Sequence, residues 1–276
     1  RALDWSRQAG FDNLGLDLMY GLPGQTLQAW QKNLETAISF VPEHLSCYQL
    51  TLEQGTPLAR GQAAGQFQAL SEETAREFFL FTAEFLENRG YLHYEISNFA
   101  RGPARKSRHN CKYWNHTPYL GLGPAAHSYR DGRRWWNHRS LEDYCRALDA
   151  GRAPVAEEEV LTAAEIRREA LFLGLRTING VPLDLVQNGA PRKAAVREAV
   201  QNGLGQVQGD RFVLTGQSDR LRSHTEARLV GGAVKGFKNA VKEGEGEKEK
   251  QANLEKKESE EGKVIEGEVT KDKDKA

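Results

Sequence analysis

The stretch Asn13-Leu-Gly-Leu-Asp-Leu-Met-Tyr-Gly-Leu-Pro-Gly24 is a short, nearly continuous apolar run that ends in a Pro-Gly turn. Such a run is typical of a strand that is buried on both faces of a parallel sheet. Asp17 interrupts it, and a carboxylate in a buried strand is costly unless it is paired or has a function. The stretch therefore predicts a central strand in which Asp17 is either a functional residue or a salt-bridged carboxylate of the sheet.

Helices and strands alternate along the chain after this stretch. Apolar residues recur every three or four positions over 27–41, behind Thr26, which can cap a helix. Further patterns predict a strand at 44–51, a helix that begins after Ser71, and a strand at 91–96. This order is typical of an α/β fold with a parallel sheet, either open or as part of a (β/α) barrel.

In such folds the chemistry gathers at the carboxyl ends of the strands. Asp17 and Thr51 fall at or near two of these expected ends, and Ser97 and Asn98 fall at a third. We therefore expect these side chains to lie near a site.

Composition limits the classes of partner. The chain has 276 residues, 39% apolar content and a formal net charge of zero, which predicts a globular core and no general attraction to nucleic acid. Its three cysteines (Cys47, Cys111 and Cys145) are odd in number and far apart, which favours a reducing compartment and makes the cytoplasm the default. No apolar run is long enough to span a bilayer.

The segment 109–129, HNCKYWNHTPYLGLGPAAHSY, interleaves histidines with aromatic rings. This pattern suits a flat, partly apolar ligand or a metal, and the alternative is an aromatic loop that covers the end of a core. The histidines are too widely spaced for a compact zinc motif. Haem needs only one or two axial ligands with apolar walls, so His109 beside Cys111, Tyr113 and Trp114 would suffice. The alternative for His109 is an imidazole bonded to a backbone carbonyl.

The remaining sequence predicts further units. Residues 131–153 are expected to form a connecting helix and a linker. In 154–216, a helix capped by Thr162, a helix over 191–202 and a hairpin over 205–215 suggest a small winged-helix-like α+β domain. Its second helix carries few basic residues, so we interpret the domain as a packing module, not a nucleic-acid reader.

The composition changes sharply near the end of the chain. Arginine is the main basic residue through Arg228, whereas every later basic residue is lysine. Residues 217–276 are therefore expected to form an amphipathic helix, suited to weak contact with a membrane surface, and a disordered tail rich in Lys and Glu.

Six blocks of the sequence resemble the HemW haem chaperones, which are radical-SAM relatives of oxygen-independent coproporphyrinogen III oxidase. The resemblance covers residues 1 to about 216, and HNCKYW is its most specific block. The blocks are DLMYGLPGQ (17–25), LSCYQLT (45–51), YEISNFA (94–100), HNCKYW (109–114), YLGLGPAAHS (119–128) and LFLGLRT (171–177).

The resemblance implies a fold and a set of sites. Residues 1–130 are expected to form the carboxyl-terminal part of a TIM-like radical-SAM barrel. HNCKYW is similar to a block associated with haem, which makes His109 the first candidate for the iron ligand and Cys111 the second. Resemblance to the oxidase places Asp17 and Thr51 in contact with S-adenosylmethionine, and His127 in the lining of the same pocket.

Two departures from the family accompany this resemblance. Radical-SAM proteins hold a [4Fe–4S] cluster through a Cys-x-x-x-Cys-x-x-Cys loop, and this sequence contains no such loop. We therefore interpret the sequence as an amino-terminally truncated member that does not cleave S-adenosylmethionine. In addition, the segment 231–243 is similar to the amphipathic helix of TatA, a protein of twin-arginine translocation.

The functional expectation is a cytoplasmic haem-binding chaperone that passes haem to other proteins. One alternative is a radical-SAM porphyrinogen oxidoreductase of haem biosynthesis. A second alternative is a non-functional remnant fused to a membrane-surface helix.

Overall fold

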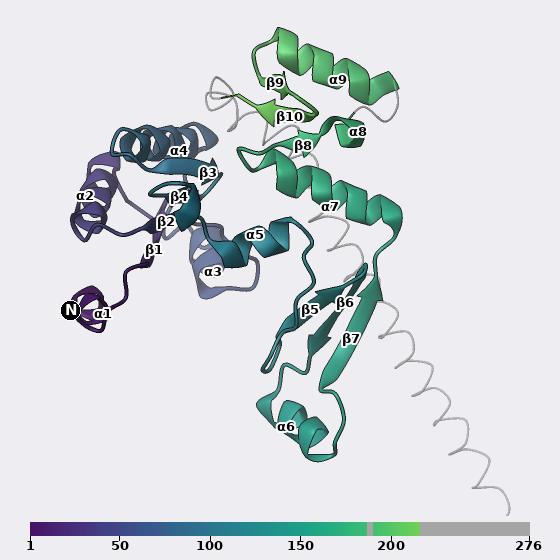
Figure 1. Cartoon of the computed structure of the whole chain (residues 1–276). Helices are drawn as coiled ribbons and strands as arrows, with labels where there is room; N and C mark the ends of the chain where they lie inside the picture. The colour runs from purple at the N-terminus through teal and green to yellow at the C-terminus, as the bar shows by residue number, and fades with distance from the viewer. Residues whose placement is uncertain (187–189, 216–276) are drawn as a thin grey trace, which may run out of the picture. The chain divides into compact units, whose positions relative to one another are not determined.

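The computed structural model describes residues 1–186 and 190–215 (Figure 1). The tail expected at 217–276, with its amphipathic helix and its resemblance to TatA, lies outside these residues. In the described part of the chain, no helix is long and apolar enough to cross a membrane.

The amino-terminal part contains a sheet of four strands in the order β1-β2-β4-β3. As expected, β1 and β2 are parallel, with Asp17 beside Ser46 in the register. The strand β4 was not predicted from the sequence. It lies between β2 and β3 and runs antiparallel to both, so the sheet is not all parallel. The elements of this part are α1 (Ala2–Gln8), β1 (Gly15–Tyr20), α2 (Leu27–Ser39), β2 (His44–Gln49), α3 (Pro57–Ala63), α4 (Glu72–Glu87), β3 (Leu92–Glu95) and β4 (Asn98–Ala100).

The expectation that β1 is buried on both faces is wrong. Gly15, Asp17 and Met19 are exposed, while Leu16 and Leu18 pack against the hydrophobic core. The reason is that the main core lies against only one face of β1, the face of Leu16 and Leu18, which leaves the face of Asp17 open to solvent. Asp17 is therefore a solvent-facing carboxylate without the desolvation cost of a buried one.

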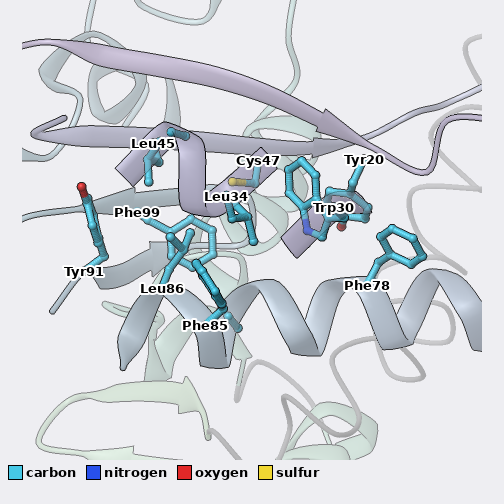
Figure 2. Packing of buried hydrophobic residues seen from close by; sticks show 12 residues of the cluster. Tyr20, Trp30, Leu34, Leu45, Cys47, Phe78, Phe85, Leu86, Tyr91 and Phe99 are labelled. Atoms are coloured by element: carbon cyan, nitrogen blue, oxygen red, sulfur yellow. The ribbon is translucent and has the colours of Figure 1, made fainter. Parts of the chain in front are cut away.

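The main core lies between the sheet and the helices α2 and α4. Figure 2 shows the core side chains in the layer between the strands and α4. Trp30 and Leu34 of α2 are fully buried there, with Phe78 and Leu86 of α4. The Trp30 indole Nε1–H donates a hydrogen bond to Thr82 Oγ1 at 2.8 Å, so the polar atom of the buried ring is satisfied.

The predicted helix starts are confirmed at atomic detail. Thr26 Oγ1 accepts a hydrogen bond from the Ala29 backbone N–H at 3.1 Å, and Ser71 Oγ accepts one from Thr74 at 3.1 Å. Thr162 forms a capping box with Glu165 at the start of α7 (Ala163–Leu175). These side chains bond backbone donors that have no partner within the helix, which is why such sequences begin helices reliably.

A second, antiparallel sheet has the strand order β5-β6-β7 and was not foreseen as a sheet. It crosses both of the expected boundaries, 130/131 and 153/154, because β6 pairs with β5 on one side and with β7 on the other. The division of the chain into 1–130, 131–153 and 154–216 remains a prediction. The elements here are the 3₁₀ turn Pro103–Arg105, α5 (Arg108–Trp114), β5 (His127–Arg130), β6 (Arg133–Asn137), α6 (Leu141–Asp149) and β7 (Val155–Val160).

The last described part joins helices to a three-stranded sheet ordered β8-β10-β9. The hairpin expected over 205–215 is present, and β8 adds a third strand to it. Val181, Val186 and Phe212 form a small buried core, an arrangement that fits the winged-helix-like expectation. The elements are α7, β8 (Val181–Pro182), α8 (Leu183–Val186), α9 (Ala190–Gln201), β9 (Gly205–Gln208) and β10 (Arg211–Leu214).

Candidate functional site

The short helix α5 carries the four haem candidates, and its geometry divides them into two pairs. Residues three or four positions apart share one side of a helix, whereas residues two apart do not. His109 therefore pairs with Tyr113, and Cys111 pairs with Trp114. The sequence pointed to one cluster, but the structure brings these residues together only as two pairs on different sides of α5.

The first pair presents an imidazole to solvent. His109 is exposed, and its ring meets the edge of the Tyr113 ring at a centroid distance of 4.8 Å. Tyr113 lies in turn 4.4 Å from the ring of Tyr119. Among the described residues, none forms a hydrogen bond or ion pair with the His109 imidazole, so the alternative of an imidazole bonded to a backbone carbonyl does not apply. A ring nitrogen beside tyrosine rings is free to bind a ligand.

The second pair faces a cavity of about 290 Å³ between α5 and α7. Cys111 and Trp114 line it from α5, and Leu173 and Gly174 line it from α7. Burial raises the pKa of the Cys111 thiol, and the nearby Lys106 ammonium opposes this shift only in part. Because the thiolate is the form that binds metals, this shift makes Cys111 a weaker candidate for the iron ligand than His109.

Tyr94 forms a polar wall of the same cavity and fixes the start of α5. Its hydroxyl lies 2.8 Å from His44 Nε2 and accepts a hydrogen bond from the Ser107 backbone N–H at 3.0 Å. Burial is the main cause that raises the pKa of Tyr94 to about 12. The phenol therefore stays protonated at neutral pH and positions the residue that caps α5.

The three S-adenosylmethionine candidates do not line one cavity in the described part of the chain. Thr51 lines a second cavity of about 640 Å³ beside the loop 21–25. Asp17 is exposed on β1. His127 lies on β5 in the other sheet, with its ring 5.5 Å from that of Trp136. Their common role stays a prediction from the resemblance.

Glu95, for which the sequence predicted no role, is only 1% exposed. Its carboxylate accepts hydrogen bonds from Asn98 Nδ2 at 2.6 Å and from Arg176 Nε at 2.8 Å. Asn98 Oδ1 in turn accepts a bond from Ser46 Oγ at 3.1 Å. The network links β2, β3 and β4 to the end of α7. Glu95 and Arg176 lie in two of the resemblance blocks, YEISNFA and LFLGLRT, and this was the signal that could have identified them.

The residues present do not fit a [4Fe–4S] cluster. Cys47 is buried in the main core, Cys111 faces the 290 Å³ cavity, and Cys145 is exposed on α6. Among residues 1–186 and 190–215, no group of three or more His, Cys, Asp or Glu side chains could hold a metal ion.

Comparison with known proteins identifies relatives over most of the chain. No protein-family model matches. The chain is 33% identical over 222 residues to the heme chaperone HemW of Mycobacterium tuberculosis. This match covers 80% of this chain and 56% of that protein. It is 37% identical over 184 residues to HemW of Synechocystis, covering 66% and 44%.

The chain belongs to the HemW-like family. A solved structure of coproporphyrinogen III oxidase HemN from Escherichia coli, described as a radical SAM enzyme, matches with a TM-score of 0.59 at 20% identity. The match covers 80% of this chain and 56% of HemN, and it supports the same fold. The HemW-like chain has an open sheet and spans about half the length of the curated relatives that it matches.

Proposed function

We propose that this HemW-like chain binds haem and that His109 is an axial ligand of the haem iron. The observation that carries the proposal is the exposed His109 imidazole, which lies beside the Tyr113 ring and has no hydrogen-bond partner among the described residues. Imidazole nitrogen is a common axial ligand of haem iron, and tyrosine rings offer apolar surface to a porphyrin. The names of the relatives, which are heme chaperones, support the same ligand.

In this proposal the remaining haem candidates have unequal roles. Tyr113 lies against the imidazole and is 39% exposed, so it can contact a macrocycle at His109. Cys111 and Trp114 face the 290 Å³ cavity instead, and the raised pKa of Cys111 makes it the second candidate for iron. The bound haem would supply the iron, and the chain would supply the ligand nitrogen and the aromatic contact.

We further propose the contacts to S-adenosylmethionine that the resemblance implied, at Asp17, Thr51 and His127. Thr51 has the strongest support, because it follows the carboxyl end of β2 and lines a cavity together with the glycine-containing loop 21–25. We propose carriage of haem as the function, and a porphyrinogen oxidoreductase reaction stays the alternative that iron and sulfide analysis would test. The partners would be proteins that receive haem, and the compartment of this bacterial-type chaperone would be the cytoplasm.

Titration of the full chain with ferric haemin tests the ligand assignment. The Soret band and the stoichiometry should differ between the native protein and His109→Ala, with binding weakened by about tenfold or more for loss of an iron ligand. His127→Ala is the matched control, because His127 is also an exposed histidine beside an aromatic ring. Equal spectra and equal affinities for His109→Ala and the native protein would remove His109 as a ligand.

A further inference from the structure

Backbone hydrogen bonds join two parts of the lining of the cavity between α5 and α7. These parts are the segment at Tyr94 and the loop that follows α7. The Ile178 backbone N–H donates to the Tyr94 carbonyl at 3.1 Å, and the Ile96 N–H donates to the Arg176 carbonyl at 3.2 Å. The ion pair between Glu95 and Arg176 reinforces the same junction. The cavity is therefore built into the fold, and its volume of about 290 Å³ is at the low end for a small-molecule site.

The lining combines apolar surface with positive charge. Trp114, Leu173 and Leu185 contribute apolar surface, and Lys106 and Arg211 contribute cationic groups. None of the described residues that line the cavity is an aspartate or a glutamate. Such a cavity favours a ligand that has an apolar body and an anionic end.

The two cations are not neutralised by acids in the described part of the chain. The Lys106 ammonium lies 5.5 Å from the centre of the Tyr94 ring. Arg211 donates from Nε to the Asn179 carbonyl at 2.6 Å and from Nη2 to the Gly180 carbonyl at 2.8 Å. These bonds hold the guanidinium in place but leave its charge uncompensated, because carbonyl groups are neutral.

Two acids near the cavity already have partners. Glu169 is bonded to His116 at 3.1 Å and to Arg134 at 2.9 Å, and Glu95 is bonded to Arg176. Neither carboxylate is available to neutralise Lys106. A partly buried cation without an acidic partner gains most from an anion that a ligand brings.

We propose that this cavity binds a small amphipathic carboxylate. Its apolar part packs against Trp114 and Leu173, and its carboxylate pairs with Lys106 and Arg211. The cavity is too small to enclose a whole porphyrin, so the carboxylate belongs either to a propionate arm of a porphyrin held outside or to a free carboxylic acid. Both sources share the chemistry that the cavity recognises.

Binding of 4-phenylbutyrate to the full chain, measured by calorimetry or ligand-observed NMR, tests this proposal. The acid should bind at least about tenfold more tightly than the uncharged 4-phenylbutyramide, because a charge-assisted hydrogen bond is lost with the amide. Lys106→Gln should weaken binding of the acid by about tenfold and leave the amide unaffected. The matched control is Lys112→Gln, since Lys112 is an exposed lysine of α5 outside the lining.

Arg211→Gln serves as the second variant, with circular dichroism to confirm folding, and should weaken binding of the acid in the same way. Equal binding of acid and amide, or equal binding by Lys106→Gln and Lys112→Gln, would overturn the proposal. Haemin titrated in the presence of 4-phenylbutyrate then separates the two sources. Competition assigns the site to a propionate arm, and independent binding assigns it to a free acid.

Loss of carboxylate binding in the cavity can be distinguished from loss of haem binding at His109. His109→Ala leaves the lining of the cavity unchanged, because His109 lies on another side of α5. The variant should therefore bind 4-phenylbutyrate with native affinity even if haemin binding is lost.

Discussion

The sheet β1-β2-β4-β3 and the sheet β5-β6-β7 are stabilised in different ways. The first packs against α2 and α4 over a cluster of fully buried side chains such as Trp30, Leu34 and Phe78. The second has few buried apolar residues, among them Tyr129 of β5. It carries instead cross-strand ion pairs, in which Arg133 pairs with Glu158 and Arg134 with Glu159.

The difference has an energetic consequence. Full burial of a large apolar side chain contributes roughly 1.5–3 kcal/mol, whereas an exposed ion pair contributes about 0–1 kcal/mol. The first sheet should therefore tolerate changes of salt and pH that loosen the second. In the sequence, α5 lies between the two sheets, and it contacts α7. The candidate site therefore lies between a region with a buried apolar core and a region that depends more on ion pairs.

The largest expected effect comes from the core of the first sheet. Trp30→Ala removes a fully buried ring and leaves Thr82 Oγ1 without its donor. We expect a loss of about 3–5 kcal/mol in the free energy of unfolding, measured by urea denaturation followed by circular dichroism. Trp5→Ala is the control, because Trp5 is 64% exposed and its loss should change stability by less than about 0.5 kcal/mol. Equal effects would contradict the contrast between the two regions.

An intermediate effect is expected where the first sheet meets α7. Glu95→Gln removes a buried charge and leaves Arg176 without its ionic partner. Because the Arg176 side chain is 37% exposed and can be solvated, we expect a loss of about 2 kcal/mol, less than for a wholly buried pair. Glu84→Gln, at an exposed position of α4, is the control variant for the same denaturation measurement. A stability change below about 0.5 kcal/mol for Glu95→Gln would show that the network is not structural.

The smallest effect concerns the second sheet and depends on pH. The hydrogen bond from His116, aided by Arg134, lowers the pKa of Glu169 below its ordinary value of 4.5, although burial opposes the shift. A carboxyl whose pKa is lowered on folding stabilises the protein above its unfolded pKa, and this contribution is lost as the pH falls through the folded pKa. Glu169→Gln should therefore cost about 1 kcal/mol near neutral pH and progressively less below about pH 4.5.

Thermal unfolding of native and variant protein across this acidic range measures the pH effect. Glu157→Gln is the matched control, since Glu157 is an exposed acid on β7. Its stability should differ from that of the native protein by less than about 0.5 kcal/mol, as is usual for an exposed position. A difference between native and Glu169→Gln that persists unchanged in acid would contradict the assignment.

Much of the local structure could be predicted because its causes are local. The caps Thr26, Ser71 and Thr162 bond backbone donors within the next few residues, so their sequence signals suffice. The hairpin over 205–215 depends in the same way on its Gly-Asp turn. The sequence was less informative about β1, because burial on both faces depends on whether other elements cover the strand.

The sequence by itself determined the order of helices and strands, the resemblance blocks and the choice of His109 as the first ligand candidate. Only the tertiary structure decided that Asp17 faces solvent, that β4 enters the sheet, and that α5 separates His109 from Cys111. It also placed Lys106 and Arg211, which are far apart in the chain, in the lining of one cavity. Such contacts follow from the packing of distant segments, whose geometry no local sequence pattern specifies.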